Sequence, residues 1–307
     1  MISNIGDYKL SGFKRLIFII NPNAGVHKKE GVFTGIVNMF FDYGYTTTVL
    51  FTRKAGDATE FVEKFATSSV DLIVCMGGDG TLNETLRGVN NVKWRKPFGY
   101  IPAGSTNDYA SSLGLPTDPI EAAKRIMTGK VRSLDLGMFN DSLFVYTACV
   151  GLFTNTSYET PQKVKNIIGH LAYVLEGMKD MTQFKPVYVK IDTGEQVLED
   201  NYIYVGICNT YSLGGVMKLD DSAIDLGDGA YELLAISMPR DIFQTTNIIT
   251  ALLTQKYETC NLIHFSKITH CEIYYPRPGD WSLDGERGKG KEKNVFDIIP
   301  DAVNFLC

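Results

Sequence analysis

The chain has 307 residues, with 30 Lys and Arg side chains against 35 Asp and Glu, so its formal net charge is −5. Apolar residues make up 44% and charged residues 21% of the chain, a globular balance that excludes a disordered, collagen-like or coiled-coil protein. The negative net charge argues against a nucleic-acid partner, which would require a basic face.

The length predicts two domains, because domains cluster at roughly 100–200 residues. No apolar run approaches the roughly 18–20 residues that span a bilayer, and residues 1–10 lack the pattern of a signal peptide. We therefore expect a cytoplasmic protein. The six cysteines and four histidines show no metal-ligand spacing, and in a reducing compartment the cysteines are expected to be core residues.

The first third of the chain alternates strand and helix patterns. Strands are expected at 15–20, 46–51, 70–76 and 98–101, and helices at about 28–43, after 57, at 81–89 and after 118. Asp57 with Glu60 forms a capping-box pattern, and Asp118 precedes Pro119 at a first helical position. The alternation predicts a three-layer α/β/α domain with a parallel sheet over residues 1–132.

After residue 132, strand-like runs follow one another at 143–150, 186–191, 201–209, 231–237, 262–265 and 271–275. They predict an antiparallel β-sandwich domain over residues 133–293. Two helices are expected to interrupt it, one from Thr160 and one at about 241–255. The apolar face of the first fits either packing on the sheet or contact with lipid. Residues 294–307 are apolar again and are expected to return to the first domain.

Three glycine-bearing turns, at residues 21–25, 77–84 and 102–108, each follow an expected strand of the first domain. In a parallel sheet such turns lie at one edge, where ligands bind. The second turn, Gly-Gly-Asp-Gly-Thr-Leu-Asn-Glu, lets the backbone approach a phosphate and exposes N–H groups to it at a helix start. Asp79 either supplies a carboxylate for a magnesium ion bridging phosphates or caps the helix.

The motifs Asn-Pro-x-x-Gly, Gly-Gly-Asp-Gly-Thr-x-Asn-Glu and Pro-x-Gly-x-x-Asn-Asp, in this order, resemble the catalytic domain of the diacylglycerol kinases and of the related sphingosine and ceramide kinases. The resemblance extends along nearly the whole chain, through Asp135-Leu136-Gly137, Gly214-Gly215, Asp228-Gly229 and Asp284-Gly285-Glu286. It implies that the chain uses ATP and Mg²⁺ to phosphorylate the hydroxyl of diacylglycerol, giving phosphatidic acid.

The resemblance also implies roles for individual residues. Those implied to contact ATP are Asn21, Pro22, Asn23, Ala24, Gly25, Thr52, Gly78, Asp79, Gly80, Thr81, Leu82, Asn83, Glu84, Ser105, Asn107 and Asp108. Ser105 stands where the family usually has threonine, and it keeps the hydroxyl. A structural Mg²⁺ site is implied at Asp225, Asp228 and Ala230, although this turn lacks a proline that many relatives carry and also fits a solvated acidic loop.

Glu286 is implied as the proton acceptor, with Asp284 as its support, since phosphoryl transfer needs the attacking hydroxyl oriented and relieved of its proton. The spacing of the two carboxylates leaves the reverse assignment open. The basic run that follows fits a solvated loop or a contact with anionic phosphates. Its members are Arg287, Lys289, Lys291 and Lys293.

Other acceptors stay open, namely phosphatidylglycerol, sphingosine and ceramide. NAD kinases share Gly-Gly-Asp-Gly-Thr, but not the third turn or the terminal Asp-Gly-Glu at this spacing. Outside the enzymes, the alternative is a non-catalytic nucleotide or lipid binder, and the presence of Asp79 and Glu286 argues against it. A lipid acceptor implies peripheral contact with the inner membrane surface, and the resemblance leaves a homodimer open.

Overall fold

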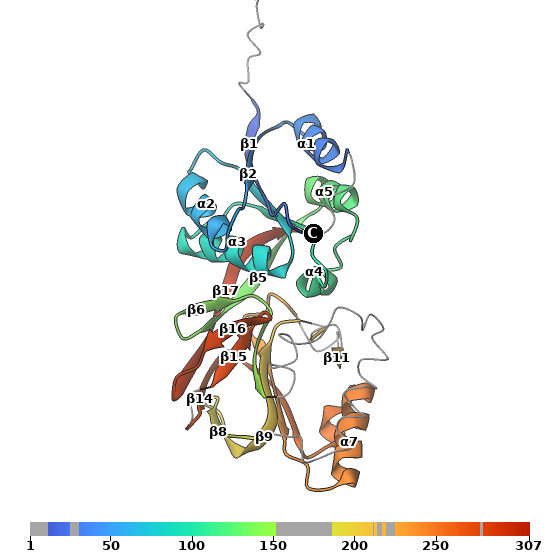
Figure 1. The fold of residues 1–307 in the computed structure, drawn as a ribbon, viewed down its shortest axis with the longest axis vertical. Helices are drawn as coiled ribbons and strands as arrows, with labels where there is room; N and C mark the ends of the chain where they lie inside the picture. Colours follow the sequence, from blue (N-terminus) through green and yellow to red (C-terminus); the bar gives the residue numbers. More distant parts are fainter. Residues whose placement is uncertain are drawn as a thin grey trace, which may run out of the picture.

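The computed structural model describes residues 12–24, 31–151, 186–210, 212–213, 217–218, 225–276 and 279–307. Its first part is a parallel sheet with helices on both faces (Figure 1). The strands are β1 (Lys14–Ile20), β2 (Tyr45–Phe51), β3 (Leu72–Gly77) and β4 (Phe98–Pro102), in the spatial order β4-β3-β1-β2. The helices are α1 (Val32–Asp42), α2 (Asp57–Phe65), α3 (Asp79–Asn91), α4 (Asp108–Ser112) and α5 (Pro119–Thr128). The predicted α/β fold of this part is confirmed.

Successive residues of a strand point to opposite faces, and each face of this sheet has its own helices. Phe18 of β1 packs in one cluster with Phe40 of α1 and Ile126 of α5. Its neighbour Ile19 belongs to the opposite cluster, with Leu86 of α3. Because both faces are covered, a continuous apolar run such as that of β1 is stable at the centre of the sheet.

The second part of the chain is an antiparallel β-rich region, as predicted. Its elements are β5 (Val131–Phe139), β6 (Ser142–Phe144), β7 (Thr147–Gly151), β8 (Val187–Asp192), β9 (Val197–Cys208), β10 (Ser212–Leu213), β11 (Met217–Lys218), β12 (Tyr231–Ser237), α7 (Ile242–Thr254), the 3₁₀ turn η2 (Tyr257–Thr259), β13 (Ile263–Ile268), β14 (His270–Tyr274), β15 (Asp280–Leu283), β16 (Glu286–Lys289) and β17 (Lys293–Leu306). The core of this part includes Val205, Leu233, Trp281 and Phe296.

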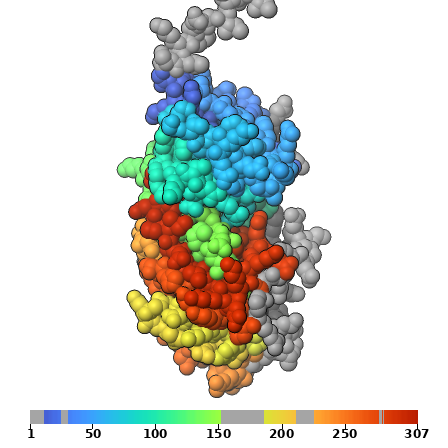
Figure 2. Space-filling view, turned by 90° about the vertical axis from the view of Figure 1, so that its left-hand side faces the viewer, coloured from blue at the N-terminus to red at the C-terminus, as the bar shows by residue number. Residues whose placement is uncertain are grey.

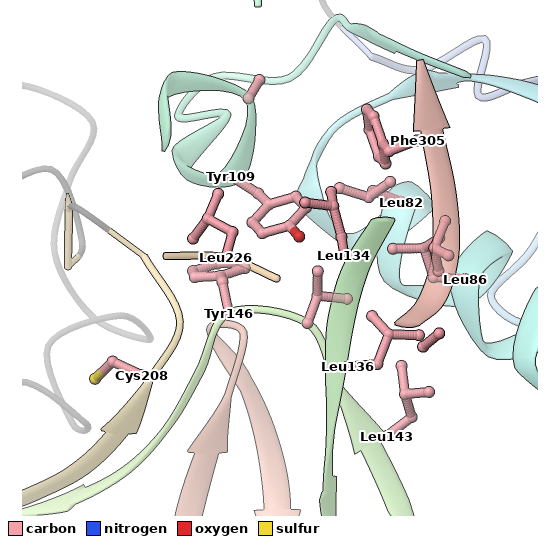
Figure 3. Close-up of a cluster of buried hydrophobic side chains, with 14 of the residues drawn as sticks. Leu82, Leu86, Tyr109, Leu134, Leu136, Leu143, Tyr146, Cys208, Leu226 and Phe305 are labelled. Carbon is pink, nitrogen blue, oxygen red and sulfur yellow. The ribbon is translucent and has the colours of Figure 1, made fainter. Parts of the chain in front are cut away.

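Strand β17 joins the two parts of the molecule. It pairs with β14 and β5 in antiparallel fashion, and near its end Phe305 pairs with Phe98 of β4 in parallel. In Figure 2 the first part of the chain, coloured blue and teal, lies directly against C-terminal residues, coloured red. Figure 3 shows the buried side chains at this junction, where Phe305 and Tyr109 lie near Leu82 and Leu134. Since β5 and β17 run through the junction, the domain boundary at residue 132 stays a prediction.

One strand prediction is wrong in a way that matters for the site. The expected strand at 143–150 is two strands, because β6 ends at Phe144 and β7 begins at Thr147. The backbone N–H groups of Val145, Tyr146 and Thr147 donate to the carboxylate of Asp284. A side chain therefore takes the donors that a strand ladder would otherwise use.

The capping signals had different outcomes. Asp118 caps α5 by accepting from the backbone N–H groups of Ile120 and Glu121, as predicted. The capping box at Asp57 is wrong, because Gly56 is the N-cap of α2. The Asp57 carboxylate instead accepts from the backbone N–H groups of Arg53 and Lys54 in the preceding turn, at 2.7 and 3.1 Å.

Three expected features lie outside the described residues: the helix from Thr160, the Gly214-Gly215 pair and Gly25. The start of the first expected helix, at residues 28–30, also lies outside them. In the ranges that are described, no helix is long and apolar enough to cross a membrane.

The packing of Phe305 generates a stability prediction. Its ring is fully buried and contacts Phe98, with ring centroids 5.4 Å apart. Phe305→Ala should lower the free energy of unfolding by about 3–5 kcal/mol, because it leaves a cavity where the two parts meet. Urea denaturation measures this loss. Phe41→Ala, at a helix position where the side chain is 55% exposed, is the matched control and should cost far less. Equal losses for the two variants would contradict the packing described.

Candidate active site

The first and second glycine-bearing turns are joined by hydrogen bonds at the carboxyl ends of β1 and β3. The backbone N–H of Asn21 donates to the carbonyl of Met76 at 2.9 Å. The Asn21 side-chain amide donates to the hydroxyl of Thr81 at 3.1 Å, and its carbonyl oxygen accepts from the N–H of Asn23. Asn21 therefore stabilises the conformation of the first turn and connects it by a hydrogen bond to the start of α3.

The second and third turns meet backbone to backbone. A Cβ added to Gly104 would lie 2.5 Å from the Cα of Gly78, so no side chain fits at this contact. Asn107 holds the third turn closed, with its Oδ1 accepting from the N–H of Gly104 and its Nδ2 donating to the Gly104 carbonyl. The structure thus brings all three turns together at one edge of the sheet, where the parallel topology predicts a ligand site.

Asp79 is the first residue of α3, directly after its N-cap Gly78. Its Oδ2 accepts from the backbone N–H of Asp108 at the start of α4, at 3.4 Å. Its Oδ1 is buried and has no hydrogen-bond partner in the described part of the chain. Burial raises the pKa of this carboxyl, while backbone N–H groups of residues 107–109 oppose the rise.

The remaining residues implied to contact ATP lie around these turns. Thr52 is buried at the end of β2, and its N–H donates to the carbonyl of Ile20 at 2.9 Å. Ser105 is exposed on the third turn, so its hydroxyl is free to meet a ligand. Leu82 has its side chain in the core, which leaves only its backbone for a ligand. The others are Pro22, Asn23, Ala24, Gly80 and Glu84.

Asp284 lies in the β15–β16 turn with a left-handed backbone at φ 51°, and its carboxylate is buried. Besides the three N–H groups at 145–147, at 2.7 to 3.0 Å, it accepts from the Asn83 side chain of α3 at 2.6 Å. Burial raises the pKa of Asp284 to about 6, while these donors oppose the rise. Because four donors occupy its oxygens, Asp284 connects the two parts of the molecule and is poorly placed to accept a proton from a substrate.

Glu286 is the first residue of β16 and is exposed. Its Oε1 lies 3.3 Å from the point where a Cβ on Gly80 would be, so the carboxylate covers the start of α3. The two carboxylates of Asp284-Gly285-Glu286 thus differ in environment, one enclosed by donors and the other open above the second turn. Gly285 between them has φ 85°, a conformation that glycine adopts without strain.

Two of the three residues implied as a structural metal site, Asp225 and Asp228, form ion pairs with the protein's own cations. Asp225 accepts from Arg132 at 2.8 Å, and Asp228 pairs with Lys267. Asp228 also accepts from the N–H of Ala230 at 3.1 Å. Within the described ranges no group of three or more His, Cys, Asp or Glu side chains could hold a metal ion. Both carboxylates of this turn are thus engaged by the protein's own cations, and the metal site stays a prediction.

Two buried carboxyls next to this turn were not assigned a role from the sequence. Asp135 accepts from the N–H groups of Gly229 and Asp301, at 2.7 and 2.9 Å, and so fixes the turn to β17. Glu232 of β12 is completely buried, and neither of its oxygens has a partner among the described residues. Two sequence features could have indicated these buried carboxyls. Asp135 belongs to the Asp-Leu-Gly motif, and Glu232 is an acidic residue inside an apolar strand.

Two of the four basic residues after Glu286 form ion pairs with acidic side chains. Lys291 pairs with Asp141 at 3.2 Å, and Lys293 pairs with Glu272 at 2.7 Å. Both pairs lie at the surface, where such contacts contribute little to stability. The solvated-loop interpretation suits these two lysines better than a phosphate contact.

Comparison with known proteins relates the chain to lipid kinases. Residues 15–139 match the family described as diacylglycerol kinase catalytic domain. The chain is 31% identical over 276 residues to the diacylglycerol kinase of Bacillus subtilis (strain 168), covering 90% of each protein. It is 30% identical over 285 residues to the diacylglycerol kinase of Staphylococcus saprophyticus, covering 93% of each.

Solved structures agree with the fold. A crystal structure of a Bacillus anthracis str. Sterne protein superposes with a TM-score of 0.81 at 25% identity, covering 96% of this chain and 97% of that one. A crystal structure of a diacylglycerol kinase from the same organism gives a TM-score of 0.72 at 24% identity, covering 96% and 97%.

The buried carboxyl of Glu232, which has no hydrogen-bond partner among the described residues, makes stability depend on pH. Burial raises the pKa of the Glu232 carboxyl from 4.5 to about 8. The folded protein therefore holds this proton more tightly than the unfolded chain does. Its free energy of unfolding falls as the pH rises from about 4.5 to about 8. Glu232→Gln removes the ionisation and should stabilise the protein at pH 9, on the order of 3 kcal/mol, with little effect at pH 5. Urea unfolding at both pH values tests this. The exposed Glu258→Gln should shift neither curve, and a Glu232→Gln variant with no gain at pH 9 would contradict the burial described.

Proposed function

The chain belongs to the diacylglycerol kinase family, and on that premise we propose that it transfers the γ-phosphate of Mg-ATP to the hydroxyl of diacylglycerol, giving ADP and phosphatidic acid. It is a lipid kinase, and a kinase of this family uses ATP. The observation that carries the proposal for this chain is the position of Glu286, whose carboxylate lies over Gly80 where the second turn meets α3.

The three turns would hold the nucleotide. The start of α3 presents backbone N–H groups and the positive end of the helix dipole, which favour phosphate oxygens. The close contact between Gly78 and Gly104 places the second and third turns side by side, so both would line one phosphate-binding site. We assign the three turns and Thr52 to ATP, with Ser105 supplying a hydroxyl at the third turn.

Glu286 would act as the general base. The acceptor hydroxyl attacks the γ-phosphorus, a new O–P bond forms, and the bond from phosphorus to the oxygen that stays on ADP breaks. The hydroxyl proton passes to Glu286. Asp284 would be a positioning residue, because its hydrogen bonds to residues 145–147 and to Asn83 fix the turn from which Glu286 projects.

Magnesium would enter as part of the Mg-ATP substrate. Asp79 fits it, because its buried Oδ1 accepts no hydrogen bond from the described residues. A cation there would neutralise charge developing on the phosphates. The carboxylates of Asp225 and Asp228 pair with Arg132 and Lys267, so no step is assigned to a second metal there.

A diacylglycerol substrate is embedded in a bilayer, so the protein would have to contact the membrane surface from one side. We place this contact on the β-rich region and the nucleotide on the first domain, with the boundary at residue 132. Peripheral binding at the inner membrane surface and a homodimer remain proposals drawn from the family.

The proposed function is tested by supplying purified protein with radiolabelled Mg-ATP and separate lipid acceptors. We expect transfer to diacylglycerol and not to phosphatidylglycerol, sphingosine, ceramide or NAD. Glu286→Gln should lower kcat by about 10²–10⁴-fold while ATP binding persists, since a general base contributes on that scale. Glu292→Gln, an exposed residue after β16, is the matched control and should keep wild-type turnover.

Transfer to another acceptor from this panel would replace diacylglycerol as the substrate. Wild-type turnover in Glu286→Gln would exclude Glu286 as the base. Binding of ATP with no transfer to any acceptor would refute the kinase assignment.

A further inference from the structure

The outward face of helix α7 carries three exposed apolar side chains among uncharged polar ones. Phe243 is 78% exposed, Leu253 55% and Ile242 47%, while the opposite face of the helix, including Ile248, is buried against the β-rich region. Figure 1 shows α7 at the end of the molecule remote from β1 and α1. The Asp241 side chain caps the helix by accepting from the N–H of Gln244 at 2.8 Å. The helix is therefore well formed, and its apolar residues are displayed on the surface.

The polar side chains exposed on this face are Thr246, Asn247, Thr250 and Thr254, and the threonines form hydrogen bonds within the helix. The hydroxyls of Thr246, Thr250 and Thr254 each donate to the carbonyl four residues earlier, at 2.7 to 2.8 Å. The sequence of α7, Ile-Phe-Gln-Thr-Thr-Asn-Ile-Ile-Thr-Ala-Leu-Leu-Thr, contains no charged residue. Helix faces exposed to water usually carry charged as well as polar side chains, and α7 has only uncharged ones. The threonine hydroxyls lower the cost of moving this face out of water, because they keep their hydrogen bonds there.

We propose that the outward face of α7 is the surface through which the protein docks on a lipid bilayer. The proposal rests on the proposed function, because a kinase whose acceptor is a membrane lipid must contact the bilayer. Phe243, Leu253 and Ile242 would enter the boundary between headgroups and acyl chains. Arg240 and Lys256 are exposed at the two ends of the helix, beside the exposed Asp241 and Glu258, so charges of both signs flank the uncharged face.

Other exposed apolar residues fit this role less well. Phe33 packs on Phe51, and Phe41 stacks on Phe13, and all four belong to the first domain, where the nucleotide turns lie. The lysines of the basic run after Glu286 that form ion pairs are also poor candidates. Among the described residues of the β-rich region, α7 is the one element that places three exposed apolar side chains on one uncharged helix face.

Fluorescence of a Phe243→Trp variant tests the contact directly. The chain has two tryptophans, Trp94 and Trp281, and both are buried, so a third at position 243 reports on the surface of α7. We expect a blue shift on addition of phosphatidylcholine–phosphatidylglycerol vesicles and quenching when brominated lipids are used. A vesicle-bound protein whose new tryptophan is neither shifted nor quenched would overturn the proposal.

A second arm measures vesicle binding and activity. Phe243→Gln combined with Leu253→Gln should weaken co-sedimentation with the same vesicles at least tenfold, while Phe41→Gln on α1, matched in exposure to Leu253, should not. Activity on short-chain diacylglycerol dispersed in detergent should stay at the wild-type level in both variants. If the wild-type protein has no activity in that assay, the kinase proposal is refuted. The assay thus distinguishes failure of the kinase proposal from failure of the docking proposal. Unchanged vesicle binding, or a change confined to oligomer size in solution, would overturn the role of α7.

Discussion

The arrangement of the active site depends on one buried carboxylate. Asp284 accepts from three consecutive backbone N–H groups and from the Asn83 side chain, which lies 201 positions earlier in the chain. A buried carboxylate is costly unless its oxygens are occupied, and here four donors occupy them. The same bonds interrupt the strand at residues 145–146, fix the β15–β16 turn and attach it to α3. The position of Glu286 above the second turn follows from this attachment.

The first domain contributes a rigid edge of the sheet to the same site. Three turns leave the carboxyl ends of parallel strands, and Asn21, Asn107 and the Gly78–Gly104 contact lock them against one another. Strand β17 then secures the domains to each other by pairing with β14, β5 and β4 along its length. A site divided between two parts of the chain is thereby held by the backbone of a single strand and by one carboxylate.

The sequence predicted the fold class and the site motifs because their causes are local. Alternating strand and helix patterns and glycine-bearing turns depend on neighbouring residues, and the family resemblance pointed to the Asp-Gly-Glu motif. The burial of Asp284 could not be predicted this way, since a carboxylate beside glycine in a turn is usually exposed and its partner Asn83 is remote in the chain. The break at residues 145–146 and the ion pairs of Asp225 and Asp228 have the same origin in tertiary contacts. Glu232 was missed because burial of an acidic residue depends on the helices and strands around it.

We propose that Asp284 acts on the reaction through Glu286. The most direct measurement is a double-mutant cycle on kcat with Asp284→Ala, Glu286→Gln and the combined variant, together with ATP binding by each. If Asp284 only positions Glu286, the combined variant should be no more than about threefold slower than the slower single variant, and ATP affinity should change little. If the two losses multiply, Asp284 makes an independent contribution to the reaction, and the account given for this carboxylate is wrong.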